Sequence, residues 1–458
     1  MYSTLRDGPP PRPSEAASDQ SRPARRPAGL AVAPVVLMLG LTSMLTDLST
    51  EMVTAVLPLY LVLSLGFSPL QVGVVNGLYQ GVTALVRLAG GVASDRFGRH
   101  RDVAAAGYAL SVLSRFALLV PGGSAAVVSG SIVTDRVGKG IRTAPRDALL
   151  SLAATENGLG VAFGVHRAMD TFGAMLGPVA AFAVLSTVPG SYRLVFAVSA
   201  CAGVVGLAVL VFFVDRRPAP EPAARPGSAA GITIIKPSGA AGRPGPSAPA
   251  GTAAPADTPA QPTMKMSLRD MMLAVTDRRL RRILVAGCVL ALATIGDAFI
   301  YLRMQRTLEI TPTMFPLLAA GTSGMYLLTS VPLGRLADRI GRARVFLGGF
   351  GALLGVYVTL LSPLRGMTAL LCCLGFLGLY YAATDGVLSA LTSAALPAGA
   401  RTTGLALVQT GVSLGQLAAS AAFGALWTVA GVETALTAAA VLLAVALAIA
   451  WSALRRTM

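Results

Sequence analysis

Twelve long apolar segments are the feature that most restricts what this chain can fold into. The 458 residues are 54% hydrophobic and only 13% charged, whereas a soluble globular protein carries roughly 25% charged residues. A helix needs about 20 apolar residues to cross a bilayer. Segments of this kind lie at 32–63, 69–92, 102–121, 124–151, 157–187, 192–214, 281–305, 313–334, 344–362, 367–394, 401–428 and 431–454. The sequence predicts an all-α integral membrane protein with twelve transmembrane helices.

Basic residues gather on one side of the predicted membrane. An even number of spans places both termini on the same side, together with the basic loops near Arg96 and Arg339. The other side keeps only scattered charges such as Arg193, Arg306 and Arg365. By the positive-inside rule, both termini lie in the cytoplasm of a multi-pass cell-membrane protein. The net charge of +16 therefore reflects topology, and we expect no nucleic-acid partner.

Two polar stretches divide the chain. Residues 1–30 are rich in Pro, Ser and Arg and predict a disordered cytoplasmic tail. Residues 215–280 are rich in Pro, Gly and Ala and predict a largely disordered cytoplasmic linker. This linker separates an N-terminal six-helix bundle at 31–214 from a C-terminal six-helix bundle at 281–458. Residues 265–282 form either an amphipathic helix on the membrane surface or a polar lead-in to the seventh span.

The two halves carry the same motifs. GVASDRFGRHR at 91–101 returns as GRLADRIGRAR at 334–344, which is 243 positions later. A Gly-x-x-x-Gly pattern at 173–177 returns at 411–415, which is 238 positions later. Near-constant offsets of polar residues and glycines indicate a duplication. Two pseudo-symmetric bundles of this kind usually move against each other around a central site to carry a solute across the membrane.

These motifs resemble those of the major facilitator superfamily of secondary transporters, over residues 32–454 apart from the linker. The family's motif after span two carries Gly, Asp, Arg, Gly and a basic residue in this order, with Ala93 here where the family often has Leu. In the family this cluster is a latch that stabilises the outward-open arrangement; a static turn is the alternative. The matching residues are Gly91, Asp95, Arg96, Gly98 and Arg99, and in the second copy Gly334, Asp338, Arg339, Gly341 and Arg342.

Span four carries a second motif of this superfamily, matched by Ile132, Arg136 and Gly140. In proton-coupled relatives this arginine is linked to proton transfer, and the alternative is a buried ion pair that holds the helices together. An arginine inside a membrane needs a partner. Because adjacent positions point to different sides of a helix, we expect the partner of Arg136 on another span rather than at Asp135.

Span five resembles the signature of the superfamily's antiporters, which export their cargo. Pro178 removes a backbone donor and bends the helix, and small residues allow close packing at the bend. The family pattern ends in two glycines, which this chain replaces with Ala and Phe. Generic small-residue packing is the alternative interpretation. The matching residues are Gly164, Gly173, Gly177 and Pro178.

Several ionisable residues lie within the predicted spans. Asp47 and Glu51 are four residues apart on one helix face, so one of the two carboxyl groups could hold a proton at neutral pH. Pairing with arginines of spans four or five is the alternative. A relay or a structural pair is also possible around His166, whose repeat partner is an uncharged residue. The proton-coupling candidates are Asp47, Glu51, Arg136, His166, Arg167 and Asp170, and the substrate-cavity candidates are Arg142, Asp297, Arg303, Asp385 and Gln409.

The sequence thus predicts a monomeric, proton-coupled antiporter that exports a small organic molecule, drug-like or metabolite, by alternating access. Its expected partners are this substrate, protons and the lipid bilayer, with the proton gradient in place of any cofactor. With two histidines and no HExxH motif, we expect neither an enzyme nor a metal site. One alternative is a carrier of an anionic or siderophore-like molecule bound by Arg142, Arg167 or Arg303. Another is a non-transporting membrane sensor.

Overall fold

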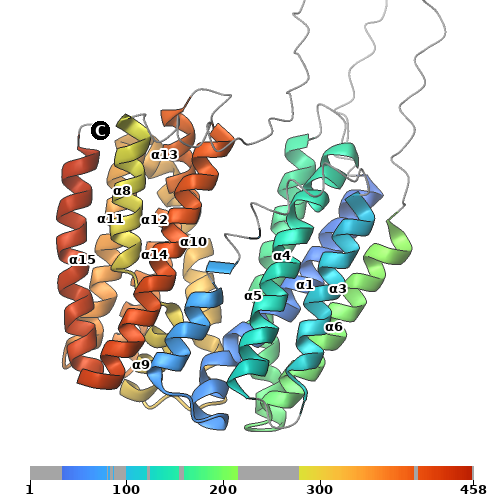
Figure 1. Ribbon diagram of the computed structural model, residues 1–458, viewed down its shortest axis with the longest axis horizontal. Coiled ribbons are helices and arrows are strands. Elements are labelled where there is room, and N and C mark those ends of the chain that lie inside the picture. The colour runs from blue at the N-terminus through green and yellow to red at the C-terminus, as the bar shows by residue number, and fades with distance from the viewer. Residues whose placement is uncertain are drawn as a thin grey trace, which may run out of the picture.

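The computed structural model forms two bundles of helices that lie side by side (Figure 1). It describes residues 33–79, 81–82, 86, 100–120, 124–153, 159–214, 278–396 and 401–455, which contain no β-strand. The predicted tail, nearly all of the predicted linker and the first charged loop at 91–99 lie outside these residues. The description begins again at Arg278, the first residue of helix α8.

The N-terminal bundle is built around its first helix, α1, which packs along α5 and α6. Helix α1 widens into a π-helical turn, η1, which begins two residues after Pro58, a residue that has no backbone donor. The elements are α1 Pro34–Leu59, η1 Tyr60–Ser64, a helical segment at 69–79, α3 His100–Ala117, α4 Ala125–Ala153, α5 Leu159–Thr187 and α6 Tyr192–Phe213.

The C-terminal bundle contains two predicted spans that are interrupted. The elements are α8 Arg278–Leu292, α9 Asp297–Thr307, α10 Pro316–Ile340, α11 Arg342–Leu361, α12 Gly366–Thr384, α13 Val387–Ala395, α14 Arg401–Ala430 and α15 Val432–Leu454. The seventh span is divided between α8 and α9, and the tenth between α12 and α13. Each interruption lies next to a glycine, which lowers the cost of leaving helical geometry.

A tyrosine side chain replaces the missing helical hydrogen bonds at the first interruption. The hydroxyl of Tyr357 in α11 accepts a hydrogen bond from the Ile295 amide at 3.0 Å and donates one to the Ala293 carbonyl at 3.3 Å. Unsatisfied backbone groups are costly in a membrane unless protein or water pairs them. Tyr357 is fully buried, and it allows span seven to break inside the bundle.

The repeated glycine motifs have the same packing role in both bundles. A Cβ atom at Gly173 of α5 would collide with the backbone of α1 at Met44, and Gly177 also abuts α1. In the other bundle, Gly411 and Gly415 of α14 abut α8. Each motif therefore lets one helix approach the first helix of its own bundle closely.

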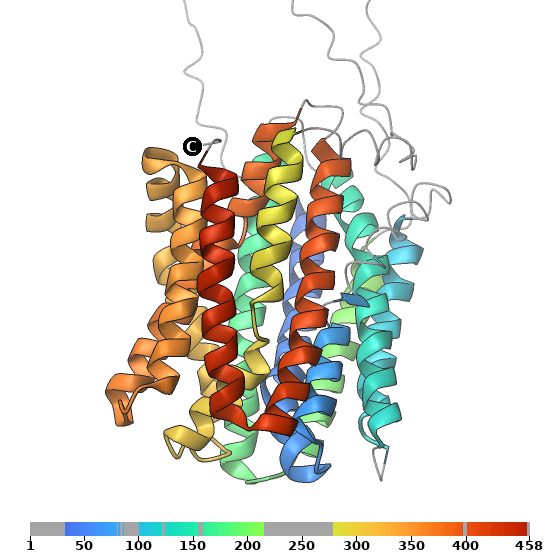
Figure 2. The ribbon, with the colours of Figure 1, turned by 60° about the vertical axis from the view of Figure 1, so that its left-hand side comes forward.

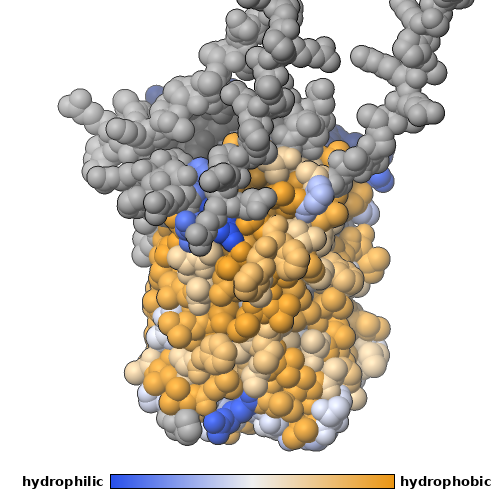
Figure 3. Space-filling model, turned by 90° about the vertical axis from the view of Figure 1, so that its right-hand side faces the viewer, coloured by the Kyte–Doolittle hydropathy of each residue, from blue (hydrophilic) through white to orange (hydrophobic). Residues whose placement is uncertain are grey.

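The outer surface is apolar, as expected of a membrane protein. Among the described residues, nine helices are long and apolar enough to cross a bilayer. A broad hydrophobic belt covers the face of the N-terminal bundle in Figure 3, with polar residues near its two ends. Helices α3 and α4 are not among the nine; they carry several charged residues, of which Arg115, Arg136 and Arg142 have side chains buried inside the bundle.

The bundles contact each other at the end that lies away from the start of α8 and the end of α15. Helix α8 begins and α15 ends on the same side of the molecule (Figures 1 and 2). On the opposite side, the Leu70 amide donates to Thr428 at 3.1 Å, and the Asn76 amide group donates to Ser420 at 3.0 Å. Gly424 abuts Pro69 in the same region. These contacts join the segment 69–79 of one bundle to α14 of the other.

Candidate functional site

A cavity of about 400 Å³ lies between the two bundles. Its walls come from α1, the segment 69–79 and α5 on one side, and from α9, α10 and α12 on the other. Three carboxylates line it, namely Glu51, Asp297 and Asp385, and four tyrosines, namely Tyr79, Tyr301, Tyr326 and Tyr381. No Lys, Arg or His side chain is part of this lining in the portion of the chain that the structure describes.

The interruption of span seven places Asp297 at this cavity. Asp297 is the first residue of α9, where a carboxylate is stabilised by the partial positive charge of the helix N-terminus. The hydroxyl of Tyr381 in α12 donates a hydrogen bond of 2.5 Å to its Oδ2 atom. Tyr301, one helical turn after Asp297, donates to Thr322 at 3.1 Å. The carboxylate thus sits between two anchored tyrosines.

The interruption of span ten places Asp385 at the exposed edge of the same cavity. Asp385 follows α12, and Gly386 has a φ of 77°, a conformation that glycine adopts without strain. The hydroxyl of Tyr326 lies 3.5 Å from the Asp385 carboxylate, at the limit of a hydrogen bond. Asp385 is solvent-exposed, whereas Asp297 is partly buried.

Asp47 and Glu51 share a face of α1 but have different surroundings. Glu51 points into the cavity and makes no hydrogen bond or ion pair with another described side chain. Asp47 faces the interior of the N-terminal bundle, where its Oδ1 lies 3.6 Å from Arg142 and 3.9 Å from Lys139. One carboxylate of this predicted pair is therefore matched by cations and the other is open to the cavity.

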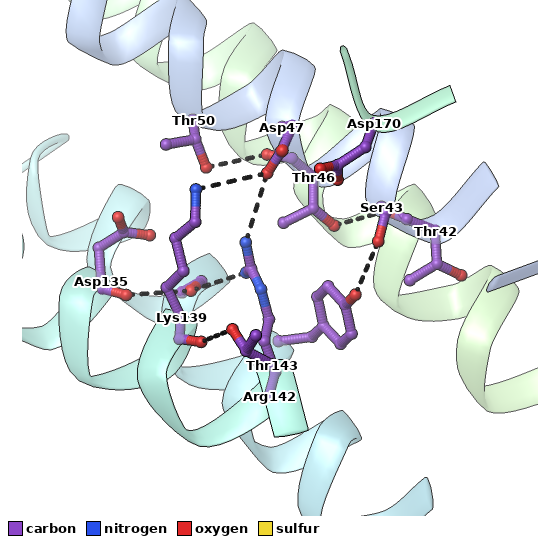
Figure 4. A network of polar contacts seen from close by, with 12 residues as sticks. Thr42, Ser43, Thr46, Asp47, Thr50, Asp135, Lys139, Arg142, Thr143 and Asp170 are labelled. Carbon is purple, nitrogen blue, oxygen red and sulfur yellow. Dashed lines mark hydrogen bonds and ion pairs between the residues drawn. The ribbon is translucent and has the colours of Figure 1, made fainter. Parts of the chain in front are cut away.

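The polar network around Asp47 connects α1, α4 and α5 (Figure 4). Asp170 of α5 lies beside Asp47, and its Oδ1 is 3.9 Å from Arg146. The Arg142 guanidinium also covers the ring of Tyr108, 4.5 Å from its centroid. The charges of these buried groups compensate one another within the bundle.

The other two candidates on α5 differ in exposure. His166 is buried, and its Nε2 atom lies 3.0 Å from the Ser43 hydroxyl, which in turn contacts Tyr108 at 3.2 Å. Arg167 is 77% exposed and lies 4.0 Å from Asp170. His166 therefore contacts a hydroxyl group rather than the carboxylate four residues away.

Arg136 belongs to a buried cluster of two arginines around one carboxylate. Arg136 pairs with Asp135, and Arg115 of α3 pairs with the other oxygen of Asp135 at 2.9 Å. Arg115 also donates to Thr50 at 2.6 Å. The partner of Arg136 was expected on another span, but its ionic partner is the adjacent Asp135, whose two oxygens contact Arg136 and Arg115 separately. Sequence reasoning missed Arg115, although a lone arginine within the third apolar segment is a visible signal.

A small, mostly apolar cavity lies beside this cluster. It measures about 30 Å³ and shares Thr54, Leu57 and Tyr79 with the lining of the central cavity. The Arg136 guanidinium lies 3.7 Å above the Tyr79 ring centroid. The Nε atoms of Arg115 and Arg136 have no hydrogen-bond partner in the structure.

The second copy of the charged loop motif forms a tight turn. Helix α10 ends before Gly341, whose φ of 102° suits glycine, and α11 begins at Arg342. Arg342 lies 3.5 Å from Asp338, one turn earlier, and both side chains are exposed. Gly334 has open space around its Cα, and Arg339 is exposed. The first copy, at 91–99, lies outside the described residues.

The remaining candidates occupy different places. Asp297 and Asp385 line the cavity, but Arg142 is held within the N-terminal bundle. Arg303 lies 3.7 Å from the exposed Glu433 of α15, and Gln409 contacts Ser389 at 3.3 Å. In span five, Gly173 and Gly177 contact α1, Gly164 has open space, and Pro178 lies inside the helix. The four cavity tyrosines were not predicted, because an isolated tyrosine in an apolar segment carries no distinguishing pattern.

Comparisons with known proteins agree with this architecture. The family model of the Major Facilitator Superfamily matches residues 39–302 and 282–457. An uncharacterised MFS-type transporter of Methanocaldococcus jannaschii is 26% identical over 402 residues, which cover 86% of this chain and 88% of that protein. An uncharacterised protein of Mycobacterium tuberculosis is 35% identical over 198 residues, which cover 43% of this chain and 48% of that protein.

Solved structures share the fold. The nucleoside transporter NupG superposes with a TM-score of 0.68 at 12% identity, covering 92% of this chain and 98% of that chain. A bacterial homologue of the human lysosomal transporter Spinster, in an inward-facing and unoccupied conformation, gives 0.66 at 14% identity over 92% and 96%. The predicted all-α fold of two six-helix bundles is therefore confirmed. Since the family model spans both bundles, the chain belongs to the Major Facilitator Superfamily and is a secondary transporter.

Proposed function

We propose that this transporter is a proton-coupled antiporter that exports a small organic molecule through the central cavity. The observation that carries the proposal is Glu51, a carboxylate on the cavity wall with no hydrogen bond or ion pair to another described side chain. An ionised carboxylate within a membrane needs a counter-charge or water, and otherwise it takes up a proton. Glu51 can therefore alternate between binding a proton and holding a negative charge next to cargo.

The neighbouring cations set the electrostatic surroundings of Glu51. Glu51 is attracted electrostatically by Lys139 and Arg136 of α4. It is repelled by the carboxylates of Asp47 and Asp135. Asp47 and Asp135 are paired with cations, so their negative charge is largely compensated. Proton binding to Glu51 thus removes the one acidic charge that the N-terminal bundle presents to the cavity from α1.

Helix packing provides a route from this charge to the bundle interface. Gly177 of α5 abuts α1 at Glu51, and α5 also packs against α10 of the other bundle. A proton shifts the balance between two conformations only if it binds them with different affinity. Movement of α1 against α5 changes the surroundings of Glu51 and so produces this difference.

The proposed export direction is supported by the predicted topology and by the resemblance of span five to the antiporter signature. With both termini in the cytoplasm, contacts at the far end of the bundles leave the cavity to receive cargo from the cytoplasmic side. Gly177, one of the span-five residues that resemble the antiporter signature, lies against α1 at the proposed proton site Glu51. Cargo release outside and proton entry then complete an export cycle.

Proton coupling can be tested in inverted membrane vesicles that hold an acidic interior. Additions from a panel of neutral, cationic and anionic organic compounds are expected to release protons, seen as dequenching of acridine orange. Glu51→Gln should abolish this proton release, since the amide cannot titrate, while Glu433→Gln should retain it because Glu433 is exposed on α15. Accumulation of a compound that is equally fast after the pH gradient is collapsed would contradict the proposal.

A further inference from the structure

We propose that the central cavity binds an organic cation with an apolar body, and that Asp297 is its principal anionic contact. This inference rests on the proposed function, because it names the chemical class of the cargo carried through the same cavity. It predicts an ammonium, amidinium or phosphonium group beside α9, and it disfavours the anionic cargo considered above.

The charge balance of the two cavity walls carries the argument. In the N-terminal bundle, Asp47, Asp135 and Asp170 each lie within 4.0 Å of a Lys or Arg nitrogen. Across the cavity, Asp297 receives a hydrogen bond from Tyr381, and no described Lys, Arg or His lies within ion-pair distance of it. A hydrogen bond stabilises a carboxylate but does not neutralise its charge. The Asp297 carboxylate on the C-terminal wall therefore has no cationic partner among the described residues, and a positively charged substrate can take that place.

The lining also excludes two other classes of ligand. An anionic solute would meet three carboxylates and no described basic group in the lining, which is electrostatically unfavourable. A bare metal ion would need several converging ligands, and no group of three or more His, Cys, Asp or Glu residues suited to a metal occurs in the described part of the chain. A polyatomic cation needs fewer ligands because its charge is spread over a larger volume.

The tyrosines beside Asp297 suit such a cation. Aromatic ring faces attract cations, and this attraction increases where water is excluded. The Tyr79 ring already carries the Arg136 guanidinium on one face, at 3.7 Å from its centroid. Tyr301 and Tyr381 flank Asp297 and have no described cation above their rings. They form an aromatic wall next to the carboxylate.

The size and remaining lining of the cavity set the rest of the ligand. A volume of about 400 Å³ is in the range of drug-sized ligand pockets. Most of the other walls are apolar, including Leu57, Leu61, Val72 and Val75. A compact ammonium ion would leave these walls uncovered, whereas an aryl or alkyl body would fill the space against them.

Tetraphenylphosphonium and tetraphenylborate provide a test, because they are ions of nearly equal shape and opposite charge. Binding of each is measured by equilibrium dialysis to the purified full-length protein in nanodiscs of uncharged lipid, with triphenylphosphine oxide as a neutral analogue. We expect saturable binding of the phosphonium alone. Asp297→Asn should weaken it about tenfold or more, as expected for a lost charge-assisted contact, while Asp102→Asn, a matched change at an exposed carboxylate of α3, should leave it unchanged.

Two further variants keep the test decisive. Asp297→Glu retains the charge and should restore most of the binding that Asp297→Asn loses. If Asp297→Asn does not fold, Asp385→Asn at the exposed edge of the cavity should weaken phosphonium binding, and its failure to do so counts against the proposal. Equal binding of the borate, or unchanged phosphonium affinity in both Asn variants, would overturn it.

The outcomes also separate this inference from the antiport mechanism. Phosphonium binding that depends on Asp297, without proton release in the vesicle assay, supports the cation site and contradicts proton coupling. Proton release driven only by neutral or anionic compounds supports proton coupling and contradicts the cation site.

Discussion

The two bundles share a scaffold but differ in what holds their interiors together. In both, a pair of glycines packs one helix onto the first helix of the bundle. The N-terminal interior then contains paired charges on α1, α3, α4 and α5, whereas the C-terminal interior is packed by aromatic groups such as Phe350, Tyr357 and Tyr380. The comparison teaches that a duplicated helix arrangement tolerates very different interiors, provided that the close helix contacts remain.

The difference extends to how each bundle meets the cavity. The N-terminal bundle neutralises most of its carboxylates internally and exposes Glu51 to the cavity. The C-terminal bundle breaks two of its helices and thereby presents Asp297 and Asp385 there. Three sets of substitutions test this contrast.

Removal of the central carboxylate of the arginine cluster should have the largest effect. Asp135→Ala leaves Arg115 and Arg136 buried without their counter-charge, at 3% and 4% side-chain exposure. Breaking a buried pair of this kind costs about 3–5 kcal/mol of folding free energy. Thermal unfolding in detergent measures the loss. Asp338→Ala, which breaks an exposed pair of the C-terminal bundle, should cost at most about 1 kcal/mol. Equal losses of folding free energy in the two variants would show that the buried charges of the N-terminal bundle do not stabilise its interior.

A methyl group at the glycine contacts should affect the two bundles unequally. Gly173→Ala places a Cβ against the α1 backbone at Met44, which cannot move aside, and should cost about 1–3 kcal/mol. Gly411→Ala meets the side-chain sulfur of Cys288 at 2.9 Å, which can shift, so its cost should be smaller. Gly164→Ala is the control, since nothing lies within 4 Å of its added atom. The measurement is the midpoint of thermal unfolding. A larger decrease in Gly411→Ala than in Gly173→Ala would contradict this prediction.

The helix break in the C-terminal bundle should depend on a single hydroxyl group. Tyr357→Phe removes the partner of the Ile295 amide and the Ala293 carbonyl and should cost about 1–2 kcal/mol, because both groups are then unpaired in an apolar interior. Hydrogen exchange at the Ile295 amide should also become faster. Tyr192→Phe serves as the comparison at a buried tyrosine of the N-terminal bundle. Unchanged exchange at Ile295 would mean that water satisfies the break instead.

Much of the architecture was predictable from local pattern. Apolar runs longer than a bilayer crossing give helices, since backbone groups in lipid must pair within their own segment. The interruptions of spans seven and ten were not predicted, although Gly296 lies at the first and Gly386 at the second. A glycine inside an apolar segment is equally compatible with close packing, and the hydroxyl of Tyr357, which pairs backbone groups at the break in span seven, comes from another helix.

The sequence by itself determined the membrane class, the two related halves and the charged residues within the spans, because these depend on hydrophobicity and spacing along the chain. Only the tertiary structure decided which of those charges meet. It paired Asp135 with Arg115, enclosed Asp47, and left Glu51 and Asp297 facing one cavity with the tyrosines. These partners come from different helices, both neighbouring and distant in the sequence, and the rotation of each helix about its axis is set by packing that no local pattern records.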